Sequence, residues 1–447
     1  MERKENQQRF DALRRDYQTF TFMSQEVALE DGELSMTFHF SLDDRYFFHP
    51  TLRIPARPFY HWESLSRQQL ETLAFHIGMV ELVSYWKLAC PKQVMVKPFE
   101  LKLCQKKWWR HLYYQGLGEF RYLNGIDCTE QDFLRIDSGT NREFSRIDAS
   151  LSERTLIPVG GGKDSVVTLE LLRKEMEVIP VIMNPRGATL SCVQTAGYPE
   201  DAFAVINRTL DPTMLRLNNE GFLNGHTPFS ALLAFVSLLI GFGSGSRYIA
   251  LSNESSANES TVPGTDINHQ YSKSVEFEKD FRKYVGEHLN EEIQYFSFLR
   301  PLNELQIAGL FSRFTAYHEV FRSCNAGSKT DSWCGHCPKC LFTWLILSPF
   351  ITRERLTEIF DKDLMADPAL RPVFEELNGT AAVKPFECVG TVEEVRACVD
   401  FLDDKEHTIV AQSPKGMTTV HEILKRFNTD HFLPERFVEI LKKALYV

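Results

Sequence analysis

The feature that most constrains this chain is a glycine-rich turn between an apolar strand and a helix. Residues 156–159 form a short apolar run, and Gly160-Gly161-Gly162-Lys163-Asp164-Ser165 follows at once, before the helical pattern of residues 164–176. Glycines allow backbone angles and close approaches that side chains would block. Their N–H groups can converge on phosphate oxygens, and the positive end of the following helix faces the same anion. The sequence therefore predicts a phosphate-binding loop.

The order of the residues excludes two kinds of nucleotide-binding loop. A Walker A loop requires Ser or Thr after its lysine, but Asp164 follows Lys163; a dinucleotide loop requires glycine where Ser165 stands. The run resembles the Ser-Gly-Gly-x-Asp-Ser loop of the PP-loop ATPases, with Gly160 replacing the first serine. That resemblance implies cleavage of ATP between its α and β phosphates, with pyrophosphate held by residues 160–165. Lys163, as a mobile positive charge, and Asp164 are expected to act in catalysis. A glycine-rich turn without a ligand is the alternative.

Around this loop the chain alternates short apolar runs with amphipathic segments, which is typical of an α/β fold with a parallel sheet. The resemblance implies the adenine nucleotide alpha hydrolase (PP-loop, HUP-like) type. We expect an N-terminal α+β domain over residues 1–150, an ATP-binding domain over 151–352 and a mostly helical region over 353–447. The expected strands of the second domain are 156–159, 178–183, 214–217, 248–252, 295–299 and 319–322. The expected helices are 164–176, 199–209, 228–242, 276–288, 303–313 and 338–347.

The end of the second expected strand is Met183-Asn184. In the PP-loop superfamily this position usually meets the adenine, so Met183 and Asn184 are expected nucleotide contacts. A turn directed by Pro185 is the alternative.

Composition excludes several classes of protein. A formal net charge of -10 argues against a nucleic-acid-binding protein, because binding the phosphate backbone requires cationic surface. The longest apolar run, Ala231–Ile240, is too short to span a bilayer, so no membrane insertion is expected. The amino terminus shows no apolar leader segment, which predicts a cytoplasmic protein.

Four of the ten cysteines are clustered in the sequence: Cys324, Cys334, Cys337 and Cys340. Four thiolates are the number that a closed tetrahedral zinc site requires. The spacing resembles the zinc site of the 7-cyano-7-deazaguanine synthases, another PP-loop family. A 4Fe–4S cluster, as in some PP-loop tRNA sulfur-transfer enzymes, and four reduced cysteines without a metal are the alternatives.

Further segments indicate a particular family. They are His76–Leu82, Ser84–Lys87, Gly118–Phe120, Asn124–Asp127, Asn224–Pro228, Ser252–Asn258 and His269–Ser274. Together with the loop and the late cysteines, they resemble the UDP-N-acetylmuramoyl-L-alanyl-L-glutamate epimerase family, called MurL, over residues 70–345.

The resemblance implies a bacterial enzyme of peptidoglycan synthesis. It would convert the terminal L-glutamate of UDP-MurNAc-L-Ala-L-Glu to D-glutamate, consume ATP, and release AMP and pyrophosphate. The chemistry is coherent, because joining AMP to a carboxylate removes its charge and makes the neighbouring Cα proton easier to remove. Mg²⁺ is expected on the triphosphate, since it neutralises the leaving pyrophosphate.

Four residues are candidates for proton transfer at that carbon. His226 and His269 have side chains that titrate near neutrality. Glu254 and Lys273 lie in polar segments after the fourth expected strand, where ligands collect in such sheets. Other PP-loop enzymes, namely a deazaguanine nitrile synthase or a tRNA sulfur-transfer enzyme, and a nucleotide-binding protein without turnover are the rival functions.

Overall fold

The computed structural model describes residues 2–259, 261–262, 264–265, 267–402, 405, 408–411 and 413–446. This part of the chain contains 11 strands and 17 α-helices, which confirms a mixed α/β protein. It divides into two compact units. Unit 1 comprises residues 1–152, 204–247 and 266–294, and unit 2 comprises residues 153–203, 248–265 and 295–447.

The first segment of unit 1 ends at residue 152, close to the expected boundary at 150, but two later segments return to unit 1 and no division falls at residue 352. Residues 204–247 and 266–294, expected in the ATP-binding domain, belong to unit 1. The cause is helix α9 (Phe229–Ser244), which is apolar on nearly every side and packs against α2 (Arg67–Trp86) of the amino-terminal segment. Such a helix has to be buried on all faces, and unit 1 provides that burial.

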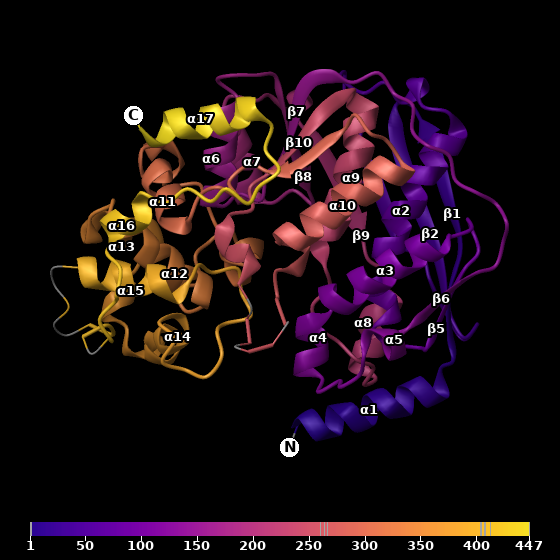
Figure 1. The fold of residues 1–447 in the computed structure, drawn as a ribbon, viewed down its shortest axis with the longest axis horizontal. Coiled ribbons are helices and arrows are strands. Elements are labelled where there is room, and N and C mark those ends of the chain that lie inside the picture. Colours follow the sequence, from indigo (N-terminus) through magenta and orange to yellow (C-terminus); the bar gives the residue numbers. More distant parts are fainter. Residues whose placement is uncertain are drawn as a thin grey trace. The chain divides into compact units, whose positions relative to one another are not determined.

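Unit 1 is built on a mixed sheet in the order β9-β4-β2-β1-β5-β6, with β3 paired to β2. Side chains alternate along β1 and β2, so that Phe20, Phe22, Phe38 and Phe40 are buried on one face. Helix α2 packs against these two strands (Figure 1). Its strands are β1 (Thr19–Glu30), β2 (Glu33–Leu42), β3 (Tyr46–Phe48), β4 (Thr51–Ile54), β5 (Gln93–Val96), β6 (Arg135–Ser138) and β9 (Ala204–Thr209). Its other helices are α1 (Glu2–Asp16), α3 (Leu103–Gly116), α4 (Gly118–Leu123), α5 (Glu130–Phe133), α8 (Pro212–Asn219) and α10 (Val275–His288).

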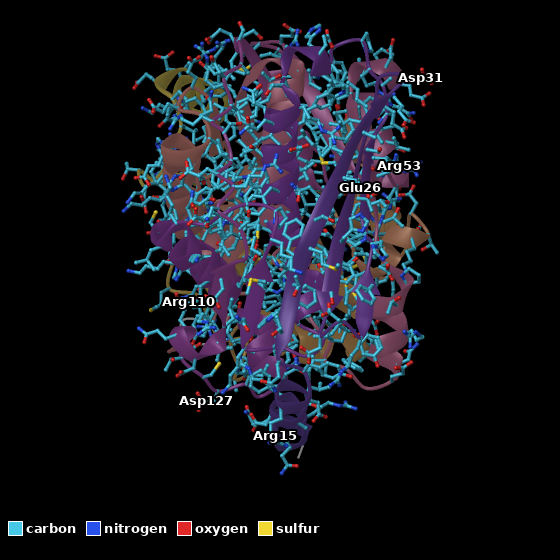
Figure 2. The ribbon with its side chains drawn as sticks, turned by 90° about the vertical axis from the view of Figure 1, so that its right-hand side faces the viewer. Arg15, Glu26, Asp31, Arg53, Arg110 and Asp127 are labelled. Atoms are coloured by element: carbon cyan, nitrogen blue, oxygen red, sulfur yellow. The ribbon has the colours of Figure 1, made fainter. Side chains whose placement is uncertain are left out.

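Charged side chains mark the two ends of this sheet. Figure 2 shows Glu26, Asp31 and Arg53 toward one end of the long strands, and Arg15 of α1 beyond the other end. Glu26 is an outward-facing residue of β1, between positions whose side chains point into unit 1.

Unit 2 contains a second set of strands in the order β11-β10-β7-β8, in which β7 and β8 are parallel. These strands are β7 (Ser152–Pro158), β8 (Val178–Met183), β10 (Ser246–Leu251) and β11 (Gln294–Ser297). Its helices are α6 (Lys163–Leu172), α7 (Gly187–Thr195), α11 (Glu304–Ser312), α12 (Pro338–Leu347), α13 (Arg353–Phe360), α14 (Arg371–Leu377), α15 (Val392–Phe401), α16 (Val420–Leu424) and α17 (Glu435–Leu445). The helical character expected after residue 353 is confirmed for the described residues, and Figure 1 shows these helices in orange and yellow.

Three expected elements are wrong. The expected strand at 214–217 lies in helix α8, because Asp211 caps the helix by accepting a hydrogen bond from the Thr213 N–H, and Pro212 occupies its first turn. The expected helix at 199–209 instead contains β9, which pairs antiparallel with β4. Residues 319–322 form no strand and follow a short 3₁₀ turn at 315–317.

No helix in the described parts of the chain is both long enough and apolar enough to cross a bilayer. The apolar run Ala231–Ile240 lies within α9, and its residues are buried in unit 1 apart from Leu233, which is half-buried.

The core of unit 1 contains one fully buried histidine. Nδ1–H of His76 donates to the Thr72 carbonyl oxygen at 2.7 Å, and its Nε2 lies 3.1 Å from the Tyr284 hydroxyl. Burial lowers the pKa of His76 from its ordinary 6.5 to about 4. The neutral ring is therefore part of the folded core.

The lowered pKa of His76 predicts a pH range in which acid reduces the stability of the fold. The unfolded chain binds the proton first, so stability is lost as the pH falls from 6.5 to about 4 and does not change further below that. The difference of about 2.5 pH units corresponds to roughly 3 kcal/mol. Replacing His76 by Gln is expected to flatten the pH dependence of denaturant unfolding in this window by a comparable amount. An unchanged slope would contradict the assignment.

Candidate functional site

The glycine loop in unit 2 has the predicted strand–loop–helix geometry. Strand β7 ends at Pro158, and helix α6 begins at Lys163 with Gly162 as its N-cap, which supplies no capping side chain. The first N–H groups of a helix have no partner within it, so this end is suited to an anion. A side chain at Gly161, where φ is +81°, would lie 3.0 Å from the backbone of Ala188 and Thr189. At Gly160 a Cβ would meet no atom within 4 Å, so the loop borders open space there.

Lys163 differs from the expectation of a mobile charge on an exposed loop. Its side chain is buried, and Nζ donates to Asp164 Oδ1 at 2.5 Å and to Glu304 Oε2. Burial opposes the charge, but the carboxylates of Asp164 and Glu304 outweigh it and raise the pKa of Lys163. Lys163 is thus a fixed buried cation beneath the loop. The Ser165 hydroxyl is also fixed, since it donates to the Gly162 carbonyl oxygen at 2.9 Å.

A second carboxylate, Glu394, holds Glu304 in position. Its Oε1 accepts hydrogen bonds from the backbone N–H groups of Glu304, at 2.7 Å, and Leu305, at 3.4 Å. Its Oε2 accepts from the N–H and the hydroxyl of Thr391, at 2.9 and 2.8 Å. Glu394 therefore caps the N-terminal ends of both α11 and α15.

Glu254 belongs to this same acidic cluster in unit 2. Its carboxylate accepts from the N–H groups of Ser256 and Ala257, while Arg300 donates to its carbonyl oxygen at 2.6 Å. Burial raises the pKa of Glu254, and the charge of Asp164 raises it further, against the opposing effect of Arg300. Burial, together with Asp164 and Glu254, likewise raises the pKa of Glu304. The loop is thus bordered by more buried carboxylates than cations.

Met183 and Asn184 lie beside the loop. The β7–β8 register pairs Pro158 with Val181, and the Val159 N–H donates to the Val181 carbonyl oxygen at 2.8 Å. The two strands therefore end at the same edge of the sheet. Met183 is half-buried, and Asn184 is exposed with φ of +51°. Their contact with an adenine remains a prediction.

In unit 1, the structure brings His226 and His269 together around a carboxylate, Glu119 of α4. Nδ1 of His269 lies 2.5 Å from Glu119 Oε2, and Nδ1 of His226 lies 3.6 Å from the same oxygen. The two ring centroids are 4.5 Å apart. Two residues that are separate in the sequence thus share a single acidic oxygen.

Close backbone packing builds this cluster. A Cβ at Gly116 would lie 2.8 Å from the Pro228 ring, so glycine allows the loop carrying His226 to contact the end of α3. The Lys87 ammonium donates to the Gly225 carbonyl oxygen, and Asn124 Nδ2 donates to the Asn224 carbonyl oxygen at 3.2 Å. Both hydrogen bonds fix the backbone immediately before His226.

The surroundings keep His226 neutral. Burial is the main cause that lowers its pKa to about 4; the charge on His269 and the ammonium groups of Lys87 and Lys273 act in the same direction, and Glu119 opposes them. Burial also lowers the pKa of Lys87 to about 8. A neutral imidazole at pH 7 can accept a proton, so the cluster is chemically able to transfer protons.

The four clustered cysteines of unit 2 also come together. The Sγ–Sγ distances are 3.7 Å for Cys324–Cys337, 3.7 Å for Cys334–Cys340 and 3.5 Å for Cys337–Cys340. A tetrahedral zinc with Zn–S bonds of about 2.3 Å requires sulfurs about 3.8 Å apart. A disulfide requires about 2.05 Å. The sulfur positions therefore fit zinc.

The cysteine cluster lies directly beside the glycine loop. The Arg322 N–H donates to the Gly161 carbonyl oxygen at 2.8 Å, and a Cβ at Gly162 would lie 2.8 Å from the Ser323 hydroxyl oxygen. Cys324 comes next in the chain. Whatever fixes Cys324 therefore also fixes a segment that contacts the loop.

Several residues of the histidine cluster and of the acidic cluster are not among those predicted from the sequence. Glu119 stands in the Gly118–Phe120 segment, which served only to indicate a family. Asn303-x-x-Gln306 and Thr391-x-x-Glu394 are helix-start patterns that would have located the ends of α11 and α15. No local pattern shows that Glu304 reaches Lys163.

Comparison with known proteins identifies the family. The model of the MurL N-terminal domain matches residues 11–298, and that of the MurL C-terminal domain matches residues 320–425. Proteins named UDP-N-acetyl-alpha-D-muramoyl-L-alanyl-L-glutamate epimerase are similar over most of their length. The protein from Salinispora tropica is 36% identical over 86% of this chain and 85% of its own. Those from Micromonospora sp. and Xanthomonas oryzae pv. oryzae are 34% and 31% identical, over 87% and 86% of both chains. With both domain models matched in order, the chain belongs to the MurL family.

Proposed function

We propose that this protein is an ATP-dependent epimerase that converts the terminal L-glutamate of UDP-MurNAc-L-Ala-L-Glu to D-glutamate. The observation that carries the proposal is the pair of imidazoles around Glu119, because epimerisation removes a proton from carbon and returns one to the other face. The names of the relatives supply the substrate.

The glycine loop supports the use of ATP in this proposal. Its N-cap has no capping side chain, and open space borders Gly160, so a pyrophosphate group has both hydrogen-bond donors and room. ATP would give AMP to a substrate carboxylate, with the bond between its α and β phosphates broken and pyrophosphate released. Met183 and Asn184 are the proposed contacts of the adenine.

The acidic cluster supports a magnesium ion beside the loop. Asp164 and Glu254 are the carboxylates that would hold it, since Mg²⁺ binds through carboxylate and phosphate oxygens. Bound there, the ion neutralises charge on the pyrophosphate. Burial and the charge of Asp164 raise the pKa of Glu254, and a bound cation would oppose both effects.

Adenylation explains why the histidines can remove so weakly acidic a proton. A free carboxylate would leave a carbanion next to a full negative charge. In the acyl adenylate that charge is gone, and the electron pair left on Cα delocalises into the carbonyl. His226 is the proposed base because it is unprotonated at neutral pH, and His269, which lies against Glu119, is the proposed acid.

We also propose a structural zinc ion at Cys324, Cys334, Cys337 and Cys340. The support is the match between the sulfur separations and a tetrahedral site. Its role would be to fix the segment beside Gly161 and Gly162, so that no chemical step passes through the metal.

The ion pair beneath the loop can be tested by paired substitutions. Lys163→Met leaves Glu304 buried without its cation, which is expected to cost about 3–5 kcal/mol of unfolding free energy. Lys163→Met combined with Glu304→Gln removes both charges and is expected to regain most of that stability. Neither protein is expected to form AMP. Equal stability of the single and double variants would show that the pair does not support the loop.

Metal analysis tests the cysteine site. Purified protein is expected to contain about one zinc ion per chain. Cys337→Ser or Cys340→Ser should lose the metal, whereas Cys104→Ser, at an exposed cysteine of unit 1, should keep it. Chelation should also expose residues 322–337 to protease. A metal-free protein with unchanged protease resistance would contradict the proposal.

Isotope exchange tests the coupling of ATP to epimerisation. In D₂O with ATP and Mg²⁺, the D-glutamate product is expected to carry deuterium at Cα, and the nucleotide products to be AMP and pyrophosphate. Without ATP, or with an analogue that cannot be cleaved between the α and β phosphates, no exchange is expected because the carboxylate keeps its charge. His226→Gln should form AMP without exchange, whereas His269→Gln should form AMP and exchange the Cα proton without producing D-glutamate. Deuterium incorporation without ATP, or ADP as product, would refute the mechanism.

A further inference from the structure

Both histidines direct the same ring nitrogen at one oxygen atom. Oε2 of Glu119 is 2.5 Å from Nδ1 of His269 and 3.6 Å from Nδ1 of His226. The first distance is a hydrogen bond, and the second is an ion-pair distance without a full hydrogen bond. A carboxylate that accepts from Nδ1–H fixes the orientation and the tautomer of the ring.

The charges around the cluster favour one added proton and oppose a second. The rings are close enough to repel when both are protonated, and the pKa of His226 is lowered by burial and by His269. Lys87 at the end of α2 and Lys273 in the 3₁₀ turn Tyr271–Lys273 add further repulsion. Glu119 alone among these groups favours a cation on His226. One carboxylate therefore faces two imidazoles that repel when both are charged, so the second proton binds only at lower pH than the first.

We propose that Glu119 is a positioning residue that holds one proton on the His226–His269 pair, so that one imidazole is neutral and the other protonated at each turnover. This inference rests on the proposed function. When the Cα–H bond breaks, the neutral ring takes that proton and the electron pair stays on the adenylated substrate. The protonated ring then gives its proton to the opposite face. The pair ends with the same single proton on the other ring, still beside Glu119 Oε2.

Histidine titration tests the charge sharing without any substrate. The protein is labelled with ¹³C at histidine Cε1, and the two signals are assigned with His226→Gln and His269→Gln. The wild-type pair is expected to take up its two protons in well-separated steps. In Glu119→Gln the first step is expected to move to lower pH, because the protonated ring loses its anionic partner. An unshifted first step would overturn the proposal.

A matched control is available in the same unit. His111 Nδ1 lies 2.9 Å from Glu130 Oε2, so Glu130→Gln removes a carboxylate from a histidine outside the cluster. It is expected to move only the His111 signal and to leave epimerisation unchanged. Should Glu119→Gln fail to fold, His226→Gln replaces it. Loss of the second ring should then move the His269 signal to higher pH, and an unchanged His269 titration would overturn the proposal.

Activity provides the second readout. Deuterium incorporated per AMP formed is expected to fall on the order of 10–100-fold in Glu119→Gln. Glu119→Asp should recover part of it and return the first titration step toward its wild-type pH. Full exchange in Glu119→Gln would overturn the proposal, and so would a stoichiometric divalent metal that is lost with this substitution. Because the titration needs no substrate, failure of the wild-type protein to epimerise the dipeptide would refute the proposed function separately.

Discussion

The buried ion pair between Lys163 and Glu304 is the interaction on which the rest of unit 2 depends. An ammonium group that is almost fully buried is stable only when carboxylates surround it, since removing one partner of such a pair costs several kcal/mol. Glu304 is held in turn by Glu394, which accepts from its backbone N–H. The N-terminal ends of α6, α11 and α15 are thereby tied together. The conformation of a six-residue loop is set by side chains 141 and more positions away.

The acidic cluster beside the glycine loop and the histidine cluster around Glu119 differ in their electrostatic surroundings. Beside the loop, burial raises the pKa of Glu254, and the negative charge of Asp164 raises it further. Around the histidines, burial lowers the pKa of His226 to about 4, and Lys87 and Lys273 act in the same direction, so that the ring is neutral at pH 7. Glu254 lies in unit 2 among the acidic groups beside the loop, and a role for it in proton transfer stays a prediction.

The features that the sequence predicts correctly are those set by residues close together in the chain. The glycines of Gly160–Ser165 predict a strand–loop–helix turn, and the structure confirms it. The spacing of the four cysteines also brings their sulfurs together. His226 and His269 could be chosen by residue type, but their common partner Glu119 is 150 positions from His269 in the chain. Such a contact depends on packing between distant segments, which single-sequence patterns do not contain.

The errors in secondary structure have the same origin. The apolar residues of 214–217 are consistent with a strand or with one face of a short helix, and the Asp211 cap decides the outcome. The sequence of residues 199–209 predicts a helix, but strand β9 forms there because it pairs with β4 of the amino-terminal segment. This pairing leaves no local pattern in the sequence. Neither the helix patterns nor the loop itself indicates that unit 1 includes residues 204–247.

The cap that Glu394 places on α11 has a consequence for how this family can diverge. The carboxylate lies in the second of the two matched domains, yet it fixes the residue that neutralises the lysine of the first domain's loop. A recombination that exchanged the carboxyl-terminal helices for others of equal stability would leave the amide of Glu304 without its acceptor, and the loop lysine with a displaced partner. Substitutions at 163, 304 and 394 are therefore expected to covary among relatives of this chain.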